Sequence, residues 1–128
     1  MTKTHFHDDL GELVSNRVTG YTIGKDGFRL ARLEGGIVEN SGLFTTARDL
    51  LLWEQNFAEP RVGSPALLAQ MQTAAMPVGD GSFYGFGLFI GERRGLRTIG
   101  HGGGDQGIST YVVRYPDQGL AKIGRVHV

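Results

Sequence analysis

Cysteine is absent from this chain of 128 residues. The absence excludes a disulfide framework, a thiolate nucleophile and a cysteine metal site. It fits either redox compartment, so the composition leaves the localisation of the protein open.

Charge of one sign and long apolar runs are absent as well. Lys and Arg together number 13, Asp and Glu together number 13, and the formal net charge is +0. Binding to nucleic acid requires a clustered basic face, and no such block occurs. No apolar run approaches the length of a bilayer span, and the first residues lack the apolar core of a signal peptide. We therefore predict no nucleic-acid partner and no membrane span.

Glycine, by contrast, is abundant. The chain has 21 glycines, about one residue in six against a usual ~7%. They follow no fixed period, which excludes collagen, and most of them separate short apolar runs. This distribution indicates a β-rich protein with many turns, and the length fits one small domain or a piece of a larger one.

Two helices are expected in the first half of the chain. Thr46 is a good N-cap for a helix over 46–57, and Asp49 three residues later suggests a capping box. The apolar face of this helix is expected to comprise Ala47, Leu50, Leu51, Trp53 and Phe57. Ser64 and Pro65 open a second helix, which should end before Pro77.

Strands are expected around and after these helices. Segments 21–23 and 28–33 are predicted to be strands on either side of a turn at 24–27. Residues 34–44, which contain several glycines, are predicted to form a loop. From residue 83 the apolar period becomes two. The expected strands are 84–92, 96–102, 108–116 and 120–128, and turns are expected at 93–95 and 116–119. The predicted class is α+β, an antiparallel β-meander with two or so helices.

The most unusual segment is GHGGGDQG at 100–107. Gly102, Gly104 and Gly107 match the G-x-G-x-x-G pattern, but a dinucleotide site needs a helix after it, and here an alternating strand follows. HGGG also occurs in lipase-like hydrolases, which require G-x-S-x-G, and no serine has that context. Neither interpretation therefore fits the segment.

His5 and His7 are two residues apart and are followed by two aspartates. On a strand, such a pair shares one face and resembles half of a metal site. No third ligand follows at a recognisable spacing. We interpret the segment as a solvated polar N-terminus and predict neither a metal nor a cofactor.

Several segments resemble the penicillin-recognising serine hydrolases, which include class C β-lactamases, D-Ala-D-Ala carboxypeptidases and related esterases. The segments are GLFTTARDLLLWEQNF (42–57), YGFGLFIG (84–91) and GHGGGDQGISTYVVRYPDQGLA (100–121). The opening MTKTHF is also similar to the L-G-M-x-x-T-x-F segment of that family. The resemblance covers residues 1–121 and implies part of a β-lactamase/transpeptidase-like fold.

The resemblance also implies roles for particular residues. His101, Gly102 and Gly103 correspond to the third active-site motif, on the strand that edges the catalytic cleft. His101 would assist proton transfer or bind a substrate carboxylate, and Gly102 and Gly103 would let substrate lie against the strand. The N–H of Gly104 would donate to an oxyanion, and Gln106 would face substrate.

The nucleophile motif of this family is missing from the sequence. No serine is followed by lysine three residues later, and no Y-x-N or S-x-N motif occurs. The last residues, 122–128, also depart from the apolar strand of the family, which suggests a truncated or altered end. We therefore expect a single partial domain over 1–128 that is inactive alone.

Two alternatives stay open at this stage. Besides an inactive fragment, the chain would be a subunit completed by another chain or a non-catalytic binding or assembly module. In each case, removing the rest of such a domain exposes strand edges, so we expect a homo-oligomer. The substrate class implied by the resemblance is a β-lactam, a peptide or an ester.

Overall fold

The structure is a computed structural model that describes residues 1–9, 11–31, 42–105 and 107–126. Its elements are β1 (His5–Phe6), β2 (Gly20–Gly24), β3 (Gly27–Ala31), β4 (Leu43–Phe44), α1 (Ala47–Gln55), α2 (Pro65–Met71), β5 (Met76–Gly79), β6 (Ser82–Gly85), β7 (Leu88–Arg93), β8 (Leu96–Asp105), β9 (Ile108–Tyr115), a 3-10 turn (Pro116–Gln118) and β10 (Leu120–Val126). No helix among the described residues is long and apolar enough to cross a membrane.

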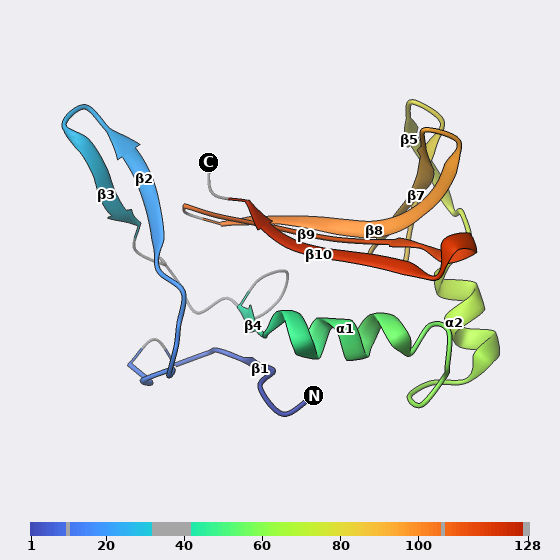
Figure 1. The fold of residues 1–128 in the computed structure, drawn as a ribbon, viewed down its shortest axis with the longest axis horizontal. Coiled ribbons are helices and arrows are strands. Elements are labelled where there is room, and N and C mark those ends of the chain that lie inside the picture. The colour runs from blue at the N-terminus through green and yellow to red at the C-terminus, as the bar shows by residue number, and fades with distance from the viewer. Residues whose placement is uncertain (10, 32–41, 106, 127–128) are drawn as a thin grey trace.

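Six of the strands form one antiparallel sheet in the order β10-β9-β8-β7-β6-β5. Each strand pairs with its neighbour in sequence, so the sheet is a meander, as expected. Helix α1 lies along the sheet beside β10, and α2 lies at one end (Figure 1). The hairpin β2–β3 forms a separate two-stranded sheet, whose Tyr21 amide donates to the Gly107 carbonyl, between β8 and β9, at 3.4 Å. Strand β1 pairs with β4. The α+β class predicted from the sequence is confirmed.

The predicted strand over 84–92 is wrong in one respect, because it is two strands. Phe86 and Gly87 both have positive φ, of 51° and 77°, and turn the chain between β6 and β7. Strand β5, which contains Pro77, was not predicted from the sequence. Proline is tolerated there because β5 is an edge strand, with one neighbour and one open side.

The end of the chain keeps to the meander. Although the sequence of 122–128 departs from the expected pattern, residues up to Val126 continue as β10 and pair in unbroken register with β9, from Leu120 opposite Tyr115 to Val126 opposite Ser109. The atypical sequence therefore does not interrupt the last strand as far as the described residues extend.

Both helices begin where their caps predicted. The Thr46 side chain accepts a hydrogen bond from the Asp49 amide at 3.2 Å, and the Ser64 side chain accepts one from the Leu67 amide at 3.1 Å. In a capping box the Asp49 side chain would also accept a hydrogen bond from the Thr46 amide, but here it makes other contacts. The Asp49 carboxylate instead accepts hydrogen bonds from the Lys3 amide and the Thr4 hydroxyl, each at 2.8 Å. Asp49 thereby ties the N-terminal segment to the start of α1.

The apolar face predicted for α1 is confirmed only in part, because Leu50, Trp53 and Phe57 are half-buried while Ala47 and Leu51 are exposed. The buried residues of the helix are Asp49 and Glu54. Leu51 and Leu52 remain 43% and 44% exposed. The buried apolar side chains are few and lie elsewhere, at Leu68, Ile90, Ile99 and Val113. The fully buried contacts of the helix are thus made by its carboxylates, and Leu51 and Leu52 are left exposed.

Candidate functional site

The candidate site is the second half of β8. Strand β7 pairs with β8 only from Leu96 to Gly100, whereas β9 pairs with it from Ile99 to Asp105. The segment His101–Gly104 therefore has a neighbour on one side, and no other described strand pairs with its opposite edge. A strand edge in this state presents backbone donors and acceptors that an extended molecule can pair with.

The three glycines of this segment leave the edge clear of side chains. A Cβ at Gly104 would meet nothing within 4 Å, and one at Gly102 would make ordinary contact with the Tyr111 ring at 3.5 Å. At Gly103 the nearest atom is the Thr110 hydroxyl, at 2.8 Å, which is the end of a side chain. None of the three has a positive φ. The backbone of the described fold therefore does not itself demand glycine at 102 or 104.

His101 is exposed at the start of this edge, beside two aromatic residues. The Tyr84 hydroxyl lies 3.3 Å from His101 Nε2, and either atom donates, depending on the tautomer. The Phe89 ring centroid lies 5.2 Å from the imidazole and 4.7 Å from the Tyr84 ring. Tyr84 comes from β6 and Phe89 from β7, so three strands converge on the imidazole.

Tyr84 was assigned no role from the sequence. It opens the YGFG motif that contributed to the family resemblance, but a sequence motif does not show that the hydroxyl faces His101 across the intervening strand β7. The structure supplies that juxtaposition.

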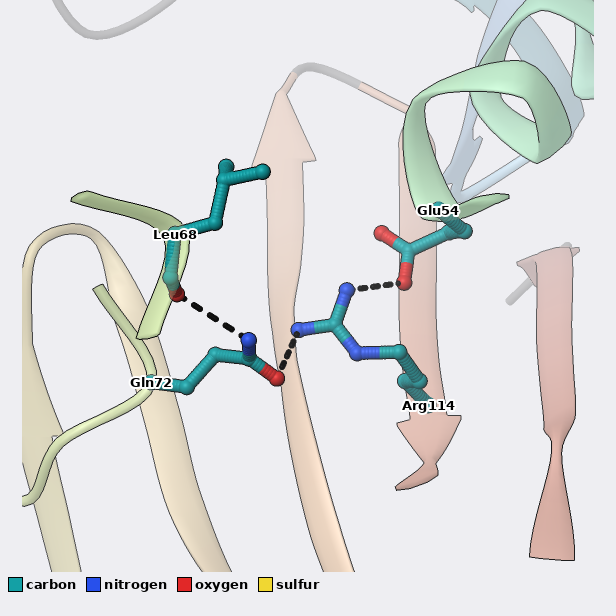
Figure 2. Close-up of polar contacts among 4 residues, drawn as sticks. All are labelled: Glu54, Leu68, Gln72 and Arg114. Carbon is teal, nitrogen blue, oxygen red and sulfur yellow. Dashed lines mark hydrogen bonds and ion pairs between the residues drawn. The ribbon is translucent and has the colours of Figure 1, made fainter. Parts of the chain in front are cut away.

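Behind β8, a buried ion pair anchors the sheet to both helices. Arg114 of β9 lies opposite Ile99 of β8 and donates to the Glu54 carboxylate at 2.8 Å (Figure 2). A longer contact of 3.5 Å joins its guanidinium to the Gln72 side chain, which in turn donates to the Leu68 carbonyl at 3.0 Å.

The guanidinium of Arg114 also lies 3.8 Å above the centroid of the Phe57 ring. Both ionic side chains are about nine-tenths buried, with relative exposures of 8% for Arg114 and 7% for Glu54. This cluster fixes β9, and through it the register of β8 next to the candidate edge.

Burial dominates the electrostatics of this pair. Desolvation raises the pKa of Glu54 despite the attraction of Arg114, and it lowers the pKa of Arg114 despite the attraction of Glu54. The loss of hydration therefore disfavours the charged form of each side chain more than the attraction of the opposite charge favours it. The pair is a positioning device that depends on both members being present.

Four of the five site residues predicted from the sequence lie together on one strand. His101, Gly102, Gly103 and Gly104 lie in sequence along the open part of β8. Gln106 lies outside the described residues. The assignment of Gly104 as an oxyanion donor stays a prediction. A shallow hollow elsewhere, between the end of α2 and strands β6–β8, contains none of these residues.

The fold is the β-lactamase/transpeptidase-like fold that the resemblance implied. It is similar to a penicillin-binding protein from Bacillus halodurans, with a TM-score of 0.83 at 17% identity over 97% of this chain. It is also similar to a D-stereospecific amidohydrolase from a Streptomyces species, with a TM-score of 0.73 at 18% identity over 98% of this chain. In each case the chain spans 39% of the other protein's length.

Within that class, the family can be stated. The family model described as Beta-lactamase matches residues 1–123, and this chain belongs to that family. No curated protein matches the chain. The family resemblance noted from the sequence is thereby confirmed.

Proposed function

We propose that this chain forms one wall of a serine hydrolase active site, and that substrate docks along His101–Gly104. The observation that carries the proposal is the edge of β8 beyond the end of β7, which pairs with β9 alone. A peptide or acyl chain adds to such an edge through main-chain hydrogen bonds. Glycine permits close approach because it has no side chain.

The chemical roles follow from what lies at the edge. His101, hydrogen-bonded to the Tyr84 hydroxyl at 3.3 Å, is suited to proton transfer or to binding a substrate carboxylate. The N–H of Gly104 would stabilise an oxyanion, a contribution typically worth about 3 kcal/mol. Gln106 would face the substrate, which we expect to be a β-lactam, a peptide or an ester.

A nucleophile is the component that these residues do not supply. No serine of the sequence stands three residues before a lysine, as the nucleophile of the Ser-x-x-Lys motif does; the serines are Ser15, Ser41, Ser64, Ser82 and Ser109. We therefore propose that the chain alone does not turn over substrate. The two alternatives to an inactive fragment are a subunit completed by another chain and a non-catalytic binding or assembly module.

Docking can be tested by NMR titration of the uniformly 15N-labelled chain with benzylpenicillin. We expect the amide signals of Gly102, Gly103 and Gly104 to shift in a saturable manner. The amides of Gly79 and Gly81, in the turn between β5 and β6, are the internal control. Shifts confined to the control glycines, or no shift at millimolar ligand, would contradict docking on β8.

Catalysis is tested separately by turnover of nitrocefin and a p-nitrophenyl ester. The proposal predicts no turnover above the uncatalysed rate for the pure chain. Turnover that a serine-directed inhibitor abolishes would overturn it. If His101→Ala leaves both titration and turnover unchanged while deletion of 108–128 prevents folding, the binding or assembly module is the better description.

Self-association is the further expectation for this chain. The hairpin β2–β3 exposes Ile23 and Phe28 at 73% each and Leu30 at 65%. The outer edges of β5 and β10 also have no strand partner within the described part of the chain. Exposed apolar patches and strand edges favour association, so we propose a homo-oligomer. Light scattering that shows a monomer at high concentration would refute it.

A further inference from the structure

Two histidines and a glutamate near the N-terminus converge on one point. Each of His5, His7 and Glu12 offers a ligand atom, and these atoms lie within 4.8 Å of one another. His7 Nδ1 lies 3.8 Å from a Glu12 carboxylate oxygen. The sequence suggested the two histidines, but Glu12 joins them only because the chain turns after residue 9.

The fold positions each of these side chains through separate contacts. The backbone N–H of His7 donates to the Gly42 carbonyl at 2.8 Å, and its ring stacks on Phe44 at 4.7 Å between centroids. His5 packs edge-on against the same ring, at 5.8 Å. Strands β1 and β4 pair here, so the aromatic platform and the histidines come from segments almost 40 residues apart in the sequence.

The turn that brings Glu12 back is also held in place. The Asp9 carboxylate accepts a hydrogen bond from the Gly11 amide at 2.8 Å, and the Asp9 carbonyl accepts one from the Glu12 amide at 3.1 Å. These are local bonds of the kind that aspartate makes in turns. Residues 5–12 carry three carboxylates and no lysine or arginine, so the segment is acidic.

His7 provides the independent reason to expect a ligand. It is buried, with 3% exposure, and neither Nδ1 nor Nε2 has a hydrogen-bond partner among the described residues. A buried imidazole normally satisfies both nitrogens, because an unpaired polar atom removed from water is unfavourable. His7 Nδ1 faces the Glu12 carboxylate across a gap too long for a hydrogen bond but suited to a bridging cation.

We propose that His5, His7 and Glu12 bind a divalent transition-metal ion of the zinc type. Two imidazoles and one carboxylate are a known zinc ligand set, which leaves a fourth position for water. Tetrahedral zinc with ligands at 2.0–2.1 Å places ligand atoms roughly 3.3 Å apart. His5 and Glu12 are exposed and can close the remaining distance by small side-chain rotations, while His7 is fixed.

The role of the ion follows from the segments that it joins. His5 lies on β1, and Glu12 lies beyond the following turn, so the ion would clamp this turn against the β1–β4 pair. This proposal is independent of substrate docking on β8, because it uses no residue of that edge.

The test is isothermal titration of the untagged chain, stripped with EDTA, with zinc chloride. We expect one zinc ion per chain, no comparable binding of magnesium, and a cobalt absorption spectrum with the intensity of a four-coordinate site. His5→Gln and Glu12→Gln should each weaken zinc binding at least about 10-fold, because even outer-shell changes at metal sites cost 10–100-fold. Both side chains are exposed, so these variants avoid the packing loss expected of His7→Ala.

The matched controls are His101→Gln and Glu92→Gln, which alter an exposed histidine and an exposed glutamate elsewhere. They should bind zinc within 2-fold of the parent chain, and zinc should raise the unfolding temperature of the controls but not of His5→Gln. The proposal is overturned if the parent chain binds no zinc. It is also overturned if His5→Gln and Glu12→Gln bind normally, or if His101→Gln abolishes binding.

Discussion

The two halves of β8 share one strand but have different surroundings. Residues 96–100 pair with β7, and the last two of them, the buried Ile99 and Gly100, pair with β9 as well. Residues 101–104 have β9 alone, and they are exposed or half-buried. Glycine therefore occurs in two different environments along one strand, one packed and one open.

In the first half, glycine is required by packing. A Cβ at Gly100 would clash with the Val112 carbonyl oxygen and lie 2.8 Å from the Val113 Cα, and neither backbone atom can move alone. In the second half, a Cβ at Gly104 would meet nothing within 4 Å. Since packing does not explain Gly102 and Gly104, the space that these two glycines leave is available to a bound molecule.

The largest effect is expected from removing the anchor behind the buried half. Arg114→Met leaves the Glu54 carboxylate buried without its partner, and breaking such a pair typically costs about 3–5 kcal/mol. Urea denaturation followed by circular dichroism would measure the loss of unfolding free energy.

The matched control for this change is the double variant Glu54→Leu with Arg114→Met. It removes both charges, so it should recover most of the lost stability, because apolar replacement of a complete buried pair is often neutral. If the double variant is as unstable as Arg114→Met, the loss arises from packing on Phe57 and not from an unpaired charge.

Gly100→Ala should come next in magnitude. The added methyl group must displace backbone of β9, and overpacking of this kind typically costs about 1–3 kcal/mol. The same denaturation measurement applies. A neutral Gly100→Ala variant would show that the two halves of β8 do not differ in the way described.

A smaller effect is expected from pH, with opposite signs for the two carboxylates of α1. Burial raises the pKa of Glu54, so the folded chain binds a proton there more readily than the unfolded chain. This contribution to stability is fully present below the unfolded pKa and is lost as pH rises through the folded pKa. Relative to Glu54→Gln, the parent chain should therefore lose stability as pH rises from about 4.

Asp49 should behave in the opposite way. The Thr4 hydroxyl and the Lys3 amide lower its pKa, against the opposing effect of burial. Its contribution is present above the unfolded pKa and is lost as pH falls through the folded pKa. The stability difference between the parent chain and Asp49→Asn should thus shrink below pH 4. Parallel pH profiles for the two variants would contradict these assignments.

The smallest effect on stability is expected at the open half. Gly104→Ala should change the unfolding free energy by no more than about 0.5 kcal/mol, as for an exposed site away from packed features. It should nevertheless weaken the benzylpenicillin-induced shifts, because its methyl group projects into open space. A strongly destabilised Gly104→Ala would restore a structural explanation for this glycine.

The sequence predicted much of this fold, for reasons that are local. The caps at Thr46 and Ser64 placed both helices, and period-two alternation placed most of the meander. The turn at Phe86 was missed because an aromatic residue with positive φ leaves no sequence signal. His101–Gly104 came from a motif, which showed neither where β7 ends nor that Tyr84 faces the imidazole.

What the sequence could not show were contacts between distant segments. Arg114 lies inside an alternating run and Glu54 on an amphipathic helix, and nothing local indicates that they pair over 60 residues. The burial of Glu54 accompanies that pairing and was not predicted from the apolar face of α1. Glu12 likewise joins His5 and His7 only through a turn, at a spacing that matches no ligand motif.

The most direct test of the open edge is amide hydrogen exchange along β8, measured by NMR with and without benzylpenicillin. In an antiparallel ladder, alternate amides point toward each neighbouring strand. We predict that the amides of Ile99 and Gly100, which have a strand on each side, are protected throughout. Alternate amides in 101–104 should exchange rapidly in the free chain and slow down when benzylpenicillin is bound. Uniform protection of 101–104 in the free chain, or rapid exchange that benzylpenicillin leaves unchanged, would contradict the assignment of this edge as a substrate-docking wall.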